Sequence, residues 1–197
     1  MKIKSLKSKI IKQTVLWKKQ IGSNMFKVFS RVVVRMRPDG TIVDPFNFFV
    51  FDRGNSVSAL IHIVDLDKII LLRQYRAGSD SYLFEIPAGM IDGDEKPESA
   101  VTREVMEETG FGFKKITHLM KVFLSPGGYT ESSDIYFVQT SMNLKKTEGG
   151  GRFEESEEIE IFYVDADEAI QMMHEGLIVD AKTIIALQWL ENKRLSA

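Results

Sequence analysis

The sequence predicts an α/β (α+β) protein in which a mixed β-sheet is sandwiched between helices, with a β-hairpin added at the N-terminus. Hydrophobic residues make up 44% and charged residues 27% of the 197-residue chain, which is typical of a globular protein with a core. Strand-like and helix-like segments alternate without the strict period of a βαβ array, which favours a mixed sheet. Pro97 and Gly110 bracket one helix, because proline suits a first helical turn and glycine the position after the last.

The N-terminal region combines a basic arm with a hairpin. Residues 2–12 place their aliphatic side chains near one helical face. Valines and aromatic residues then fill 28–37 and 41–51, on either side of the turn signal Pro38-Asp39-Gly40, so these two segments are expected to pair. We therefore divide the chain into residues 1–52, an arm and hairpin expected to mediate dimerisation, and residues 53–197, the main domain.

The remaining chain supplies the sheet and its covering helices. The segments expected to form strands lie at 57–64, 68–75, 81–87, 118–124, 133–140 and 159–164. Helices are expected from 97 to the glycine at 110, at 166–175 and at 181–192. A long loop rich in glycine and glutamate is expected at 145–158.

Two composition signals narrow the class of protein. The sequence contains no cysteine, so a disulfide framework and thiolate metal sites are excluded, and a cytoplasmic location is expected. No apolar run approaches the roughly 18 residues that a membrane-spanning helix needs. We therefore expect no membrane span.

The net charge of −2 conceals a strong asymmetry along the chain. Residues 1–38 contain eight Lys and three Arg and no acidic residue, so they carry +11, which leaves −13 for the remainder. Such a basic arm suits nucleic acid, an anionic lipid surface or an acidic neighbour in the protein. We favour the acidic neighbour, because the charges are not interleaved with a stacking surface, and nucleic acid is not expected as a partner.

Three glutamates on the helix that ends at Gly110 are the first candidate for chemistry. Glu104 and Glu108 lie one turn apart on the same face, with Glu107 beside them. Like charges at this spacing repel by about 0.2–0.5 kcal/mol per pair, whereas Mg²⁺ would turn the repulsion into coordination. Arg103 lies four positions before Glu107 and is placed to hold that carboxylate. The acidic triplet alone is more typical of a solvated helix face.

The full spacing around the triplet changes this interpretation. The residues from 89 to 111 match a complete Nudix box. The match consists of Gly89, five residues, Glu95, seven residues, and then Arg-Glu-Val-x-Glu-Glu-x-Gly-Phe at 103–111. The chain therefore resembles the Nudix hydrolases, which cleave nucleoside diphosphates linked to another group. The resemblance implies that Glu104 and Glu108 bind the metal with assistance from Glu107, and that the Ala88 carbonyl is a further ligand. The implied metal is Mg²⁺, with Mn²⁺ as the alternative.

Flanking motifs resemble the ADP-ribose and nucleotide-sugar pyrophosphatase branch of that family. They are Gln74-Tyr75-Arg76, Phe84-Glu85-Ile86-Pro87-Ala88-Gly89, Ser125-Pro126-Gly127-Gly128-Tyr129-Thr130-Glu131 and Asp180-Ala181-Lys182-Thr183. The resemblance implies that Arg76 contacts phosphate and that Met90 and Glu131 line the nucleotide site.

The same resemblance implies a catalytic base in the acidic loop before the last strand. By their position in the chain, Glu157 and Glu155 are the expected base and metal contact. Glu154 and Glu158 lie so near in sequence that the assignment among these four glutamates stays open. The expected catalytic set, including the residues that orient or hold the metal, is therefore Glu157, Glu155, Glu108 and Arg103.

One position departs from the branch and bears on base preference. Phe48 occupies a hairpin position where some ADP-ribose enzymes have an arginine near the nucleobase. A phenylalanine stacks on any nucleobase, so this departure puts a preference for adenine in doubt. The branch also implies a homodimer with exchanged N-terminal strands. The apolar aromatic residues of the hairpin agree, because such a surface needs burial.

The predicted function is Mg²⁺-dependent hydrolysis of the pyrophosphate bond of a nucleoside diphosphate sugar, ADP-ribose or a related compound, to a nucleoside monophosphate and a sugar phosphate. One alternative is a 5′-end RNA pyrophosphohydrolase that uses the basic arm. Another is a Nudix module that senses a nucleotide without cleaving it. A sensing module would be expected to lose box carboxylates, and every one is present here.

Overall fold

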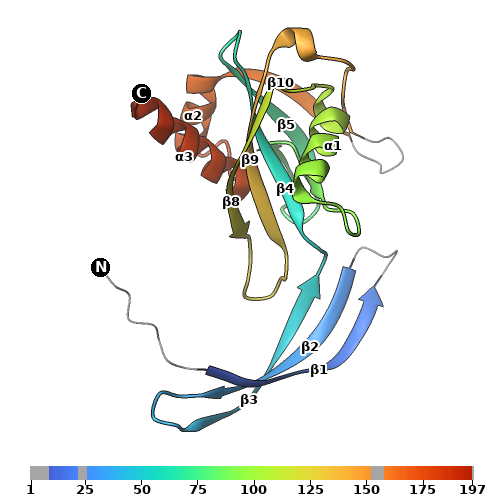
Figure 1. Ribbon diagram of the computed structural model, residues 1–197, viewed down its shortest axis with the longest axis vertical. Helices are drawn as coiled ribbons and strands as arrows, with labels where there is room; N and C mark the ends of the chain where they lie inside the picture. The colour runs from blue at the N-terminus through green and yellow to red at the C-terminus, as the bar shows by residue number, and fades with distance from the viewer. Residues whose placement is uncertain (1–8, 22–25, 152–157, 197) are drawn as a thin grey trace. The chain divides into compact units, whose positions relative to one another are not determined.

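The computed structural model describes residues 9–21, 26–151 and 158–196, and these residues fall into two compact units (Figure 1). The first unit contains the described residues up to Gly54 together with Ser125–Glu131. The second contains Asn55–Leu124 and the described residues from Ser132 onward.

The first unit is built on a three-stranded antiparallel sheet of β1 (Lys9–Ile21), β2 (Phe26–Met36) and β3 (Ile42–Asp52), in that order. The expected hairpin is confirmed as β2 and β3. Its turn depends on Gly40, whose φ of 87° favours glycine, and on Asp39, whose carboxylate accepts the N–H of Thr41 at 2.9 Å. That hydrogen bond holds the pKa of Asp39 below its ordinary value.

Residues 9–12 were expected on a helical face, and the structure corrects this. They begin β1, which pairs with β2 from Lys9 opposite Met36 to Ile21 opposite Phe26. The segment is rich in β-branched residues, and β2 offers it a long row of backbone partners. Strand pairing over this length outweighs a weak helical periodicity, because short isolated helices are marginal in water.

The segment Ser125–Glu131 joins the first unit through β3. The N–H of Phe51 donates to the Gly128 carbonyl at 2.7 Å, and the N–H of Thr130 donates to the Phe51 carbonyl at 3.0 Å. The rings of Phe51 and Tyr129 stack with centroids 5.3 Å apart. A loop distant in sequence is thereby fixed to the hairpin.

The second unit contains a seven-stranded sheet with helices on both faces. The sheet has the order β10-β5-β4-β9-β8, with β6 added to β5 and β7 added to β4. The strands are β4 (Ser56–Ile63), β5 (Lys68–Arg76), β6 (Ser81–Glu85), β7 (Ala88–Met90), β8 (Lys115–Phe123), β9 (Ser132–Thr140) and β10 (Glu160–Asp165). β4 and β9 are parallel and the other pairs are antiparallel, so the expected mixed sheet is confirmed.

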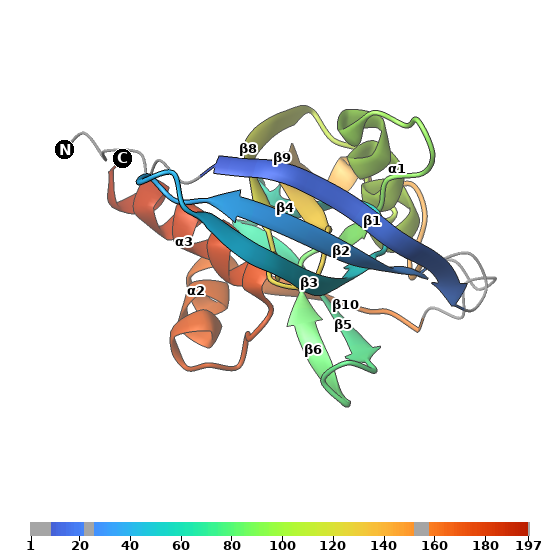
Figure 2. The ribbon, with the colours of Figure 1, turned by 90° about the horizontal axis from the view of Figure 1, so that it is seen from below.

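Three α-helices cover this sheet. They are α1 (Pro97–Thr109), α2 (Ala166–His174) and α3 (Ala181–Leu195), and a short 3₁₀ helix lies at Met142–Leu144. Side chains alternate across β4, so Ile61 packs in the cluster under α1 whereas Leu60 packs in the cluster under α2 and α3. Figures 1 and 2 show α1 on one side of the sheet and the other two helices opposite. The expected sandwich is therefore confirmed.

The C-terminal end of α1 is fastened by glycines. Gly110 caps the helix with φ of 75°, and its N–H donates to the Met106 carbonyl at 2.9 Å. Gly150, whose φ is also positive, donates its N–H to the Glu108 carbonyl at 2.9 Å. A Cβ on Gly149 would lie 2.6 Å from that same carbonyl oxygen, so only glycine allows this approach. The segment that precedes the acidic loop is thus tied to the helix that carries the box glutamates.

None of the helices in the described part of the chain combines the length and the apolar character needed to cross a bilayer.

Candidate active site

Helix α1 presents its three box glutamates beside the short strand β7. The Glu104 side chain is 12% exposed and that of Glu107 is 24% exposed. Glu108 is 3% exposed, so its carboxylate is almost removed from water. Burial of a carboxylate is costly unless hydrogen bonds or cations compensate it, and the surrounding contacts show how that cost is met.

Arg103 compensates the negative charge on this face of the helix. Its Nη1 donates to Glu104 at 2.6 Å and to Glu107 at 3.3 Å. Its Nη2 donates to Glu95 at 3.0 Å and to the Met90 carbonyl at 2.9 Å. Hydrogen bonding to Glu95, followed by that to Glu104, raises the pKa of Arg103. The guanidinium therefore remains a permanent cation that orients three box carboxylates.

Gly89 provides the space that the Glu104 carboxylate occupies. A Cβ built on Gly89 would lie 2.0 Å from the carboxyl carbon and one oxygen of Glu104, and 2.3 Å from its other oxygen. Atoms cannot approach so closely, so any side chain at this position would displace the carboxylate. Glycine at the start of the box is therefore required for the contact between helix and strand.

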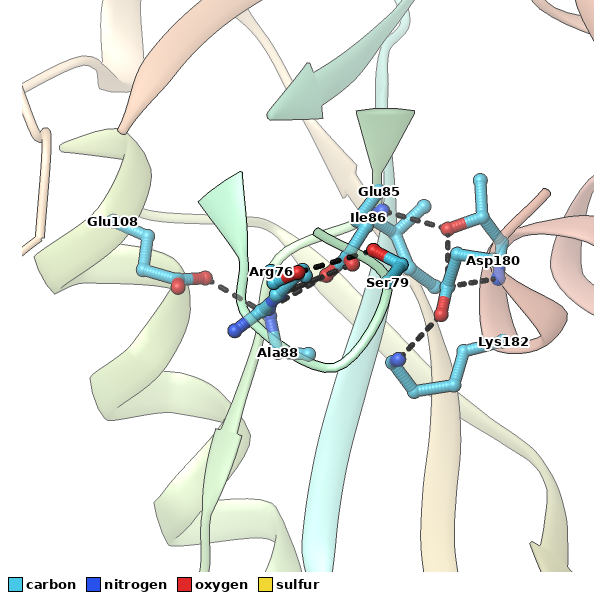
Figure 3. A network of polar contacts seen from close by, with 9 residues as sticks. Arg76, Ser79, Glu85, Ile86, Ala88, Glu108, Asp180 and Lys182 are labelled. Carbon is cyan, nitrogen blue, oxygen red and sulfur yellow. Dashed lines mark hydrogen bonds and ion pairs between the residues drawn. The ribbon is translucent and has the colours of Figure 1, made fainter. Parts of the chain in front are cut away.

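Glu108 makes the second contact between α1 and β7. Its Oε2 accepts the N–H of Ala88 at 2.9 Å (Figure 3). Glu108 and Glu104 consequently approach two adjacent residues, Ala88 and Gly89 respectively, from one helix.

The donor set of this face suits a hard divalent cation. It consists of carboxylate oxygens with a neighbouring backbone, and Mg²⁺ prefers oxygen ligands. Within residues 9–21, 26–151 and 158–196, no three acidic or histidine side chains already converge on one point. Arg103 and the Ala88 N–H occupy oxygens of the box carboxylates, so small side-chain rotations would be needed to bring them onto one ion. The residues present fit the metal in the chemistry of their donor atoms, and the carboxylates that would converge on it lie on one helix.

A second cation lies close to this face. Arg76, at the end of β5, donates through Nε and Nη2 to Glu85 at distances of 2.6–3.1 Å (Figure 3). The Glu85 side chain is 5% exposed, whereas that of Arg76 is 36% exposed. Burial alone would lower the pKa of Arg76, but the Glu85 hydrogen bonds and the charges of Glu85, Glu108 and Asp180 raise it. Arg76 is thus a fixed cation that keeps access to solvent.

Sequence reasoning did not assign a role to Glu85. It lies within the motif before Gly89, and no spacing rule pairs it with Arg76. In the register of β5 and β6, Glu85 lies opposite Leu72 and Arg76 opposite Ser81, so the contact is made only by the long side chains. A glutamate in an otherwise apolar strand is the one signal that could have identified it, since buried carboxylates are paired.

The other predicted site residues are distributed over both units. Met90 ends β7, and its carbonyl accepts from Arg103. Phe48 and Glu131 belong to the first unit, where Phe48 is 42% exposed. Glu154, Glu155 and Glu157 lie outside the described residues. Glu158 is described and exposed.

Comparison with known proteins matches this chain to a family model and to relatives that are named as pyrophosphatases. The NUDIX domain model matches residues 53–187. GDP-mannose pyrophosphatase of Klebsiella pneumoniae is 32% identical over 197 residues, covering 97% of this chain and 95% of that protein. GDP-mannose pyrophosphatase of Escherichia coli K12 is 31% identical over 188 residues, with 92% and 96% covered. A crystal structure of ADP compounds hydrolase superposes with a TM-score of 0.67 at 23% identity, covering 94% of this chain and 97% of that chain, and shows the same fold.

Gly89→Ala tests the packing of Glu104 against β7. The added Cβ is expected to push the carboxylate away and to lower the affinity for Mn²⁺ by about tenfold or more, measured by calorimetric titration, while thermal unfolding shows a folded protein. Gly78→Ala is the matched control, because nothing lies within 4 Å of its Cβ position. Wild-type Mn²⁺ affinity in Gly89→Ala would contradict the assignment of Glu104.

Proposed function

The chain belongs to the Nudix family, and we propose that it hydrolyses the pyrophosphate bond of a nucleoside diphosphate sugar to a nucleoside monophosphate and a sugar phosphate. The substrate class is supported by relatives named GDP-mannose pyrophosphatase that align over nearly the whole chain. ADP-ribose and GDP-mannose are the substrates to test first.

The observation behind the proposal is the placement of the Glu104 and Glu108 carboxylates of α1 beside Gly89 and Ala88, with Glu107 on the same helix. Glu104 and Glu108 would hold Mg²⁺, or Mn²⁺ in its place, with Glu107 and the Ala88 carbonyl as further ligands. When bound, the ion supplies positive charge that polarises the pyrophosphate for attack by water. The protein contributes fixed oxygens, and Arg103 keeps two of them oriented before the ion arrives.

Arg76 is proposed to contact a phosphate of the substrate. Glu85 fixes the plane of its guanidinium, so the group loses little conformational freedom when an anion binds. Because phosphoryl transfer depends on positioning and on charge stabilisation, a preoriented cation beside the metal ligands is well suited to the task.

The remaining roles rest on the family resemblance. Glu157 or Glu155 is proposed to take the proton from the attacking water, and Glu157 also to contact the metal. Met90, Glu131 and Phe48 are proposed to line the nucleotide site. A cytoplasmic location is proposed as well.

We also propose a homodimer in which the N-terminal strands are exchanged. Several large apolar side chains of β3 support it, because they are exposed on the first unit. They are Ile42, Phe46, Phe48, Phe49 and Phe51, each between 39% and 63% exposed. A surface of this kind is stabilised by burial against a partner.

Phe49→Ser tests the dimer. Phe49 is 61% exposed, and buried aromatic anchors carry much of the binding energy of an interface. Its replacement is therefore expected to weaken self-association at least about tenfold, measured by sedimentation velocity. Phe123→Ser is the matched control, because its ring is 60% exposed in the second unit. A wild-type protein that sediments as a monomer at all concentrations would contradict the proposal.

A panel of substrates tests the activity. Wild-type protein with Mg²⁺ or Mn²⁺ is expected to release phosphomonoester from a nucleotide sugar, and Glu104→Gln and Glu108→Gln are expected to lower turnover by roughly 100-fold or more with the fold intact. Glu98→Gln, on the same helix but away from these carboxylates, should retain wild-type turnover.

The same panel separates the alternatives. Release of pyrophosphate from 5′-triphosphate RNA, without cleavage of any nucleotide sugar, would favour an RNA pyrophosphohydrolase. Binding of a nucleotide sugar without cleavage would favour a sensing module. Either result would contradict the proposed activity.

A further inference from the structure

The segment from Glu85 to Ala88 is held by side chains from three different elements. Glu85 binds Arg76 of β5, and the Ala88 N–H donates to Glu108 of α1. Between them, the Ile86 N–H donates to the hydroxyl of Thr183 in α3 at 2.9 Å. The third contact involves a helix that the proposed function leaves without a role.

The Thr183 hydroxyl is oriented by a second interaction. It donates to Oδ2 of Asp180 at 2.7 Å, so its lone pairs are left to accept from Ile86. Thr183 is 0% exposed, which means that water cannot replace it as the partner of the Ile86 N–H. Asp180 is held in turn by Lys182, whose Nζ lies 2.6 Å from Oδ1.

This contact is separate from ordinary helix capping. Asp180 already caps α3, because its Oδ2 accepts the N–H of Thr183 at 2.9 Å. The cap uses the Thr183 backbone and does not need the Thr183 hydroxyl. The hydroxyl instead connects α3 to the chain segment that leads into the box.

The position of Ile86 is transmitted to Ala88 through a stiff residue. Pro87 stands between them, with its φ locked by the ring, and its carbonyl accepts the N–H of Ala59 at 2.8 Å. Ala88 is also held by its pairing with Ser58 of β4, so a shift of Ile86 would act on Ala88 through this short connection and disturb the hydrogen bond that Ala88 makes with Glu108.

We propose that Thr183, oriented by Asp180, is a positioning residue that sets the place of Ala88 and thereby the geometry of the metal site on α1. The inference rests on the proposed function for its link to catalysis. It assigns to the start of α3 a role in the affinity for the divalent ion, exerted through Ile86 and Pro87.

Thr183→Val and Thr183→Ser form the test. Valine keeps the shape of the side chain and removes the acceptor, whereas serine keeps the acceptor. Thr183→Val is expected to lower Mn²⁺ affinity by about tenfold in calorimetric titration and to lower kcat for the nucleotide sugar to a similar extent, with a smaller change in KM. Thr183→Ser is expected to lie within about threefold of wild type in each quantity.

Two results would overturn the inference. One is wild-type Mn²⁺ affinity in a folded Thr183→Val protein, and the other is equal damage in Thr183→Ser, which would assign the effect to packing. Should Thr183→Val fail to fold, Thr183→Cys gives the same comparison, because its sulfur is only a weak acceptor. A wild-type protein that binds Mn²⁺ but cleaves no nucleotide sugar would contradict the proposed function alone, since the titrations still decide the role of Thr183.

Discussion

The hydrogen bond from the Ala88 N–H to the buried carboxylate of Glu108 is the contact on which the site depends. A carboxyl group that is 3% exposed is tolerated only when hydrogen bonds or cations replace its lost hydration. The bond fixes α1 against β7 and brings the box carboxylates to the backbone of Ala88. Gly89 completes the arrangement, because it alone leaves room for the Glu104 carboxylate.

Charge compensation around this contact follows a consistent pattern. Arg103 donates hydrogen bonds to carboxylates of α1. Arg76 donates to Glu85, and its charge also interacts with that of Glu108. Both arginines are held by carboxylates at short range: Arg76 by Glu85, and Arg103 by Glu95 together with two of the proposed metal ligands, Glu104 and Glu107. A polyanionic substrate would therefore meet cations whose directions are already set, which reduces the reorganisation that phosphoryl transfer requires.

Local signals were sufficient to predict much of the fold. Pro97 and Gly110 mark the ends of α1, the turn at 38–40 marks the β2–β3 hairpin, and β-branched runs mark most strands. The spacing of the box also brought Glu104, Glu107 and Glu108 together on one helix. The strand β1 and the three-residue strand β7 were missed, because each depends on a partner strand rather than on its own sequence pattern. The pairs Arg76–Glu85 and Ile86–Thr183 were missed for the same reason, since residues up to 97 positions apart meet only through the tertiary fold.

A crystal structure with Mg²⁺ and a nucleoside diphosphate sugar whose bridging oxygen is replaced by methylene would test whether α1 is the metal-binding element. We expect an ion at about 2.0–2.1 Å from carboxylate oxygens of Glu104 and Glu108, with the diphosphate bound to it and Arg76 against a phosphate. A diphosphate bound with no ion at α1, or an ion held elsewhere in the chain, would contradict the assignment of this helix as the metal-binding element.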